Sequence, residues 1–112
     1  MTTLNSLLPM VSRNGHRIIV QGSITIDNVV TMTQRGAELF DQSHLVIDLD
    51  KVTEVDSTII SMLLEWLRTT RKSGYQLEFI NIPQSLESLI QLYGIAELIP
   101  VTMHHPEHQN TA

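Results

Sequence analysis

The sequence predicts an α/β fold in which helices flank a β-sheet. Near the start of the chain, two apolar segments lie on either side of a turn dipeptide, as in a β-hairpin. Further along, apolar segments alternate between strand and helix patterns, and the clearest helix covers residues 57–72. The expected order is strand, strand, helix, strand, helix, strand, helix, which is typical of a sheet flanked by helices.

The first two strands are predicted on either side of Asn14-Gly15. This dipeptide tolerates the two positive φ angles of a type I′ turn, and it separates residues 10–13 from residues 16–20. The first helix is predicted to be capped by Asp27. Its apolar positions share one face: Val29, Val30, Ala37 and Phe40.

The central strand and the long helix follow. Residues 44–49 are predicted to form a strand covered on both faces, because Leu45, Val46 and Ile47 are consecutive and apolar. The helix over residues 57–72 is expected to end at Ser73-Gly74. Its core-facing stripe repeats every three or four residues and consists of Ile59, Ile60, Leu63, Leu64 and Leu67.

The last strand and helix are marked by proline and glycine. Residues 76–80 are predicted to form a strand, and Pro83 is suited to the start of a helix because its missing N–H is not needed there. Gly94 is suited to the left-handed end of that helix. The apolar face is predicted to contain Leu86, Leu89, Ile90 and Tyr93, covered by Ile95, Leu98 and Ile99.

Composition indicates one folded domain. The chain has 112 residues, 42% of them hydrophobic and 17% charged, and it has no cysteine, which excludes disulfides and thiol chemistry. Its net charge of −5 argues against nucleic acid or anionic lipid as a partner.

The sequence pattern contains no secretory signal and no membrane span, so we expect a cytoplasmic protein. The domain is predicted over residues 9–100, between a short segment 1–8 and a mobile polar tail 101–112.

Two groups of side chains could bind a metal ion. Asp48, Asp50 and Asp56 surround the end of the central strand, where ligands of α/β sheets often bind, but turn formation and helix capping explain these aspartates more simply. In the tail, His104, His105 and His108 lie near Glu107 without an apparent supporting shell. The sequence contains no hydrolase elbow and no glycine-rich phosphate loop. We therefore predict no metal, no cofactor and no catalytic residue.

The junction before the long helix is the most informative segment. Asp56, Ser57 and Thr58 place a carboxylate and two hydroxyls at a helix start. Asp56 or Ser57 could cap the helix, which is worth about 1 kcal/mol. A hydroxyl here could equally carry or mimic a phosphate, whose charge suits the helix dipole and would alter any docked surface.

One flank of the same helix has the composition of an interface. At about 100° per residue, Thr58, Met62, Trp66 and Thr69 fall together beside the apolar stripe. Methionine and tryptophan are enriched where proteins bind one another, so this flank is predicted to be a partner surface. The alternative is that Trp66 only covers the edge of the core.

These residues resemble a known family. Residues 46–49, Val52 and the junction Val55-Asp56-Ser57 are similar to the central signature of the STAS domain, the mixed-sheet fold of anti-sigma-factor antagonists. Residues 63–68, 79–83 and 92–100 resemble the MlaB branch. That branch supplies a non-catalytic cytoplasmic subunit that binds the ATPase of the phospholipid ABC transporter maintaining outer-membrane lipid asymmetry.

The resemblance implies two readings of the junction. In the antagonists the phosphoacceptor is the second hydroxyl after the aspartate, which matches Thr58, whereas the MlaB-like hydroxyl follows the aspartate directly and matches Ser57. Ile59 and Ile60 occupy the stretch where a glycine is usual, which leaves less room for a kinase to approach the backbone. A transporter subunit is the first expectation, and a phosphorylation-regulated anti-sigma-factor antagonist is the alternative.

Overall fold

The computed structural model describes residues 8–41 and 44–101. It contains one four-stranded sheet in the order β1-β2-β3-β4. β1 is antiparallel to β2, whereas β2, β3 and β4 are parallel, so the sheet is mixed and the predicted α/β class is confirmed. In chain order the elements are β1 (Met10–Asn14), β2 (Arg17–Ile24), α1 (Val29–Glu38), β3 (His44–Val55), α2 (Thr58–Lys72), β4 (Gln76–Ile80), α3 (Gln84–Leu92) and the 3₁₀ turn η2 (Ala96–Leu98).

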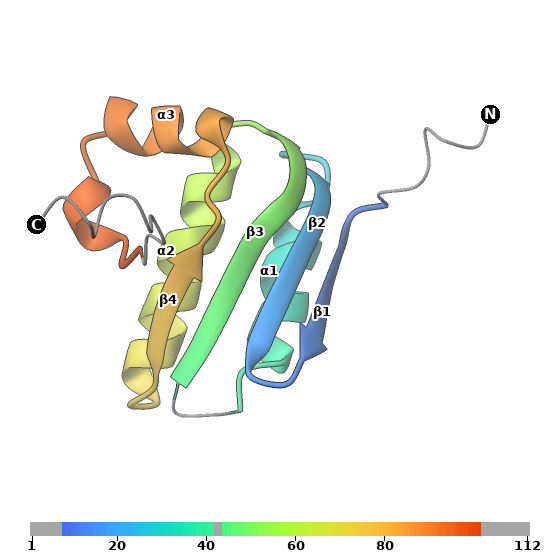
Figure 1. The fold of residues 1–112 in the computed structure, drawn as a ribbon, viewed down its shortest axis with the longest axis vertical. Helices are drawn as coiled ribbons and strands as arrows, with labels where there is room; N and C mark the ends of the chain where they lie inside the picture. The colour runs from blue at the N-terminus through green and yellow to red at the C-terminus, as the bar shows by residue number, and fades with distance from the viewer. Residues whose placement is uncertain (1–7, 42–43, 102–112) are drawn as a thin grey trace, which may run out of the picture.

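One face of the sheet carries the core. Figure 1 shows α1 and α2 on the same side of the strands. Alternate strand residues point toward these helices and are almost fully buried, because successive side chains of a strand lie on opposite faces. They comprise Ile18, Val20, Ile24, Leu45, Ile47, Leu49, Leu77 and Phe79.

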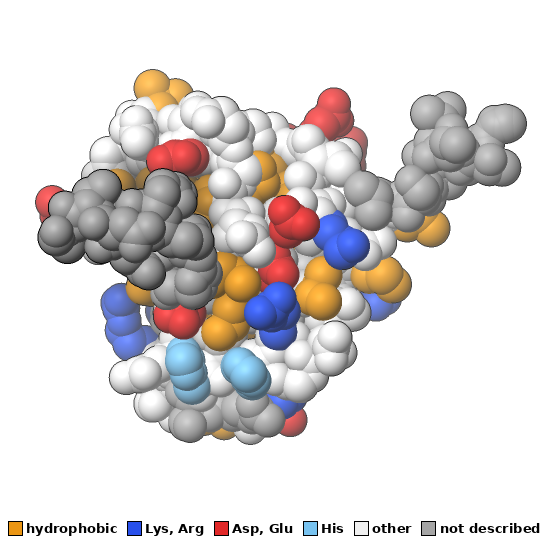
Figure 2. Space-filling model, viewed as in Figure 1, with side chains coloured by type: hydrophobic (Ala, Val, Ile, Leu, Met, Phe, Trp, Pro, Cys, Tyr) orange, Lys and Arg blue, Asp and Glu red, His pale blue; other side chains and the backbone are white. Residues whose placement is uncertain are grey.

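The other face of the sheet carries polar and apolar side chains together. Figure 2 shows acidic, basic and apolar side chains interspersed over this face. Val46 and Ile80 are less than a tenth exposed there, and Asp48 lies between Arg17 and Asn81. β3 continues to Val55, beyond the predicted end at residue 49, so one long strand leads directly into the junction with α2.

The first hairpin is confirmed, but its turn lies one residue later than predicted. Asn14 pairs with Arg17, which makes Gly15 and His16 the two central residues. Of these two residues, only Gly15 has a positive φ, of 68°. The type I′ turn is therefore wrong, and a positive φ at the first central position alone is the pattern of a type II′ turn.

The start of α1 also differs from the prediction. Asn28, not Asp27, is the N-cap residue, and its side chain bonds backward, accepting from the amide of Thr25 at 3.1 Å and donating to the carbonyl of Ser23 at 2.8 Å. The helix is thereby fixed to the end of β2. Its buried positions are Val29, Met32 and Gly36, while Val30 is 66% exposed and lies off the predicted face.

The C-terminal elements follow the prediction with two exceptions. Pro83 precedes α3, Gly94 has a φ of 66° just after it, and Leu86, Ile90 and Ile99 are buried. Tyr93 and Leu98 are each more than half exposed, so their assignment to the core is wrong. Tyr93 is the C-cap residue of a nine-residue helix, so it lies beyond the helical residues that carry the buried Leu86 and Ile90.

The end of the described chain pairs with the sheet. The carbonyl of Pro100 accepts from the amide of Phe79 at 2.8 Å, and Val101 forms an isolated parallel bridge with Phe79. Val101, placed in the predicted tail, therefore contacts β4. The tail histidines lie outside the described residues.

Candidate functional site

The ends of β2 and β3 meet at one edge of the sheet. Ile24 pairs with Val55 at the end of the two parallel strands, and the amide of Asp56 donates to the carbonyl of Ile24 at 3.4 Å. Each strand then leads into a helix, β2 into α1 and β3 into α2. Both helix starts therefore lie at the edge of the sheet where ligands of α/β folds bind.

Asp56 joins these two helix starts. One carboxylate oxygen accepts from the amide of Ile26 at 2.9 Å, and the other accepts from both the amide, at 3.0 Å, and the hydroxyl of Thr58. These bonds stabilise the charged form, so the hydroxyl of Thr58, followed by the amide of Ile26, lowers the pKa of Asp56 below its ordinary value of 3.8. The predicted capping role is confirmed for Asp56.

Ser57 has no such structural role. It is the N-cap residue of α2, but its φ and ψ of −65° and −17° are helical and its side chain makes no capping hydrogen bond. The residue is exposed. The predicted alternative of Ser57 as a cap is therefore wrong, because Asp56 accepts the bond from the first turn instead.

The two hydroxyls of the junction thus differ in availability. Thr58 is partly buried and donates its hydroxyl to Asp56, whereas Ser57 presents its hydroxyl to solvent. A partner that approaches the start of α2 meets Ser57 first.

Two exposed apolar side chains lie at the start of α1, which the backbone of Ile26 connects to this junction. Ile26 is 70% exposed and Val30 is 66% exposed, and the amide of Ile26 is bonded to Asp56. We call Ile26, Val30 and Ser57 the helix-start surface. The sequence prediction missed Ile26 and assigned Val30 to the core, since apolar residues near a helix start are not distinguishable from core residues by spacing alone.

The prediction that one flank of α2 is an exposed partner surface is wrong for Met62 and Trp66, which are buried. Met62 and Trp66 are 0% exposed, and the indole N–H of Trp66 donates to the carbonyl of Thr33 at 2.9 Å. Phe40 packs edge-on against the indole, with ring centroids 5.7 Å apart. Thr69 is only partly buried.

Gly36 explains how the indole fits between the helices. A Cβ on Gly36 would overlap the Trp66 ring, so the missing side chain makes room for the indole. A glycine inside a helix costs about 1 kcal/mol relative to alanine. Because glycine weakens a helix, Gly36 was the feature of the sequence that could have indicated a close contact at this position of α1.

The three aspartates do not form a metal site. Asp48 and Asp56 are eight positions apart on extended chain, or about 26 Å at roughly 3.3 Å per residue. Asp48 instead accepts from the amide of Asp50 and the side chain of Asn81, each at 3.0 Å, and from Arg17 at 3.2 Å. Over residues 8–41 and 44–101, no group of three or more metal-ligating side chains converges.

None of the helices described is both long and apolar enough to cross a membrane. In addition, no curated protein sequence matches the chain significantly.

Solved structures of low sequence identity share the fold. A putative anti-sigma factor antagonist from Thermotoga maritima aligns with a TM-score of 0.70 and 12% identity, over 92% of either chain. SpoIIAA, an anti-sigma factor antagonist in its unphosphorylated form, aligns at 0.69 and 9% identity, over 92% of this chain and 93% of its own. An anti-sigma factor antagonist from Mycobacterium paratuberculosis aligns at 0.63 and 19% identity, over 96% and 94%.

A family model described as "Mlab, STAS domain" matches residues 10–100. The match covers every strand and helix of the structure, including the junction at Asp56. The chain therefore belongs to the STAS-domain family.

Proposed function

We propose that this chain is a non-catalytic subunit that binds the ATPase of a phospholipid ABC transporter, which maintains outer-membrane lipid asymmetry, and supports its assembly or activity. The description of the matching family model and the resemblance of the α2 and C-terminal segments to the MlaB branch support this choice. The chain acts in the cytoplasm, approaches the membrane only within the complex, and needs no cofactor or nucleic acid.

The observation that carries the proposal is the state of Ser57. Its hydroxyl is exposed and unused by the helix cap, although it occupies the position of the MlaB-like functional hydroxyl. Ile26 and Val30 add exposed apolar area to the same helix-start surface. A surface that combines apolar area with a polar contact is typical of a protein interface.

The test is co-purification with the transporter's ATPase after co-expression. Ser57→Glu places a carboxylate at a helix start, where the dipole favours it, so the fold is retained. The same carboxylate lies in the docked surface, so recovery of the ATPase falls at least about tenfold. Asn14→Glu is the matched control, because it adds the same charge to an exposed residue at the opposite end of the sheet.

Two results would contradict the proposal. One is full recovery of the ATPase by Ser57→Glu, which would remove the helix-start surface from the interface. The other is the absence of the ATPase from the wild-type preparation while a serine kinase of the anti-sigma type is recovered.

The second candidate is a phosphorylation-regulated anti-sigma-factor antagonist. Solved structures of that description share the fold, and the Bacillus cell fate determinant SpoIIAA has also been solved in a phosphorylated form. In this chain the matching hydroxyl belongs to Thr58, which must first leave Asp56, and the phosphate would then lie beside a carboxylate. Mass spectrometry of the native protein distinguishes the candidates, since phosphate on Thr58 favours the antagonist.

A further inference from the structure

Within the described residues, the outer edge of β4 is covered over only part of its length. β4 is the last strand of the sheet, and Phe79 uses its outward amide to bond to Pro100. Because the backbone of a strand repeats every two residues, the N–H and C=O of Leu77 point in the same outward direction. No backbone of the described residues pairs with this edge at Leu77.

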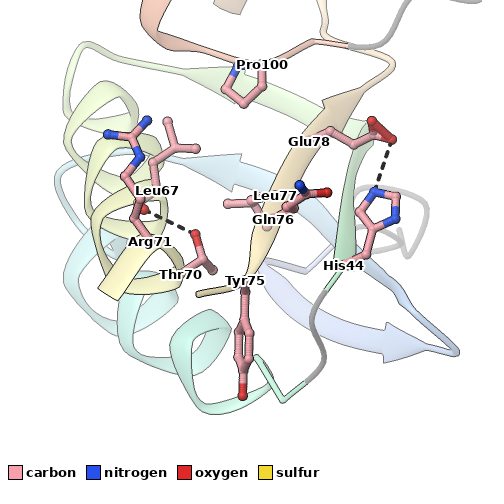
Figure 3. A pocket seen from close by; sticks show the side chains of 9 residues that line it. All are labelled: His44, Leu67, Thr70, Arg71, Tyr75, Gln76, Leu77, Glu78 and Pro100. Atoms are coloured by element: carbon pink, nitrogen blue, oxygen red, sulfur yellow. Dashed lines mark hydrogen bonds and ion pairs between the residues drawn. The ribbon is translucent and has the colours of Figure 1, made fainter. Parts of the chain in front are cut away.

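A groove of about 440 Å³ lies at this uncovered edge. Figure 3 shows Leu67, Thr70 and Arg71 of α2 on one side of β4, His44 and Glu78 on the other, and Pro100 at the far end. The remaining lining residues are Tyr75, Gln76 and Leu77. An open strand edge that lies in a groove can accept a further strand.

The α2 side of the groove is basic. Arg71 and Leu67 also line an adjacent hollow of about 410 Å³, together with Arg68 and Lys72. Arg68 pairs with Glu65 at 2.6 Å, whereas neither Arg71 nor Lys72 forms an ion pair with a described residue. In a chain with a net charge of −5, this end of α2 is a local concentration of positive charge.

We propose that the edge of β4 around Leu77 binds an extended acidic segment of a partner protein by strand addition. The segment would pair with the outward N–H and C=O of Leu77. Its alternate side chains would then lie on the α2 side, beside Arg71 and Lys72, where carboxylates are favoured. The other set would lie on the opposite face of the sheet, beside Gln76 and Glu78 of β4, where neutral side chains fit better because Glu78 is acidic.

This groove is separate from the helix-start surface. The latter lies at the start of α2, while Arg71 and Lys72 lie in its last turn, about 20 Å away along a helix of fifteen residues. The inference does not depend on the proposed transporter role, since Ser57→Glu tests one surface and Arg71→Glu the other.

The experiment titrates isotope-labelled protein with synthetic peptides and follows its amide resonances by NMR. An acetylated peptide of about eight alternating Glu and Thr residues should shift the amides of residues 75–79 and saturate. The same peptide with Lys in place of Glu should bind at least about tenfold more weakly. Rising salt should weaken binding of the acidic peptide, because Arg71 and Lys72 are exposed.

Two modified peptides test strand addition itself. One carries N-methyl groups at the odd residues and the other at the even residues, so each lacks the donors on one side of the strand. A peptide bound as a strand loses binding in one of the two forms and keeps it in the other. Equal binding by both forms would overturn strand addition.

Protein variants test the basic side. Arg71→Glu should weaken binding of the acidic peptide at least about tenfold, which corresponds to 1.4 kcal/mol. Arg35→Glu is the matched control, an exposed cation on α1 outside the groove, and should bind like wild type. Three results would each overturn the proposal. The first is unchanged binding of the acidic peptide by Arg71→Glu, and the second is the absence of saturable binding of that peptide to wild type. The third is displacement of the peptide by phosphatidylglycerol vesicles.

Discussion

Ser57 and Thr58 are adjacent hydroxyl residues with opposite surroundings. Ser57→Ala removes no hydrogen bond from the fold, so the free energy of unfolding should stay within about 0.5 kcal/mol of wild type. Thr58→Val keeps the shape of the side chain but removes the bond to Asp56, so it should lower the urea midpoint. Urea unfolding of both variants checks this, and a lower midpoint for Ser57→Ala would return that hydroxyl to a capping role.

Asp56 makes the stability of the folded protein depend on pH in the acidic range. Its pKa is lower in the folded protein than the ordinary value of 3.8, because Thr58 and Ile26 donate to the carboxylate. The folded state therefore gains stability above the unfolded-state pKa and loses it as the pH falls through the lowered folded-state pKa. Melting temperatures between about pH 6 and pH 2 should fall less for Asp56→Asn than for wild type. Parallel curves would contradict this role of Asp56.

At the scale of elements, Trp66 holds α1 against α2. Trp66→Ala removes the largest buried side chain and leaves a cavity, so it should destabilise the protein by about 3–5 kcal/mol. Loss of partner binding in this variant would follow from loss of the fold. Thermal unfolding measures the effect, and a melting temperature like that of wild type would contradict the observed packing.

Gly36 provides a second test of the same contact. Alanine is the better helix former by about 1 kcal/mol. Yet the Cβ of Gly36→Ala would overlap the Trp66 ring, so the variant should be less stable by about 1–3 kcal/mol. Gln34→Ala, at an exposed position of the same helix, is the control and should be neutral or slightly stabilising. A stabilised Gly36→Ala would show that the helices can separate at little cost.

The sequence predicted elements better than the environments of single side chains. Apolar periodicity located α2 to within one residue and β4 with both of its ends, because both patterns are long or sharply bounded. It could not distinguish Val30, which is exposed, from Met32, which is buried, since both are apolar and close in sequence. Trp66 was misplaced because its burial depends on Gly36, which lies thirty residues earlier in the chain.

The candidate site was predictable in its residues but not in their roles. Asp56, Ser57 and Thr58 follow from the strand-to-helix junction, which spacing located. That Asp56 accepts from Ile26 could not be predicted, because this bond needs β2 and β3 to end at the same edge of the sheet. That long-range bond and the first turn of α2 together occupy Asp56 and leave Ser57 for other contacts.

At the scale of the whole molecule, one apolar cluster connects all the layers. Buried residues from Ile18 on β2 to Ile99 after η2 belong to the same contiguous core, and α1 and α2 both contribute to it. No second core exists within the described chain that could remain folded when the first is lost. The helices and the sheet should therefore unfold together.

Trp66 makes this cooperativity measurable, because it is the only tryptophan and lies between α1 and α2. Its fluorescence reports separation of the helices, while far-UV circular dichroism reports loss of all secondary structure. Coincident urea transitions by the two probes are expected, with one midpoint and one slope. If the fluorescence changed at lower urea than the dichroism, the helix layer would separate before the sheet. The helix-start surface and the groove beside β4 both include residues of α2 or its N-cap, so both would then be lost before the sheet unfolds.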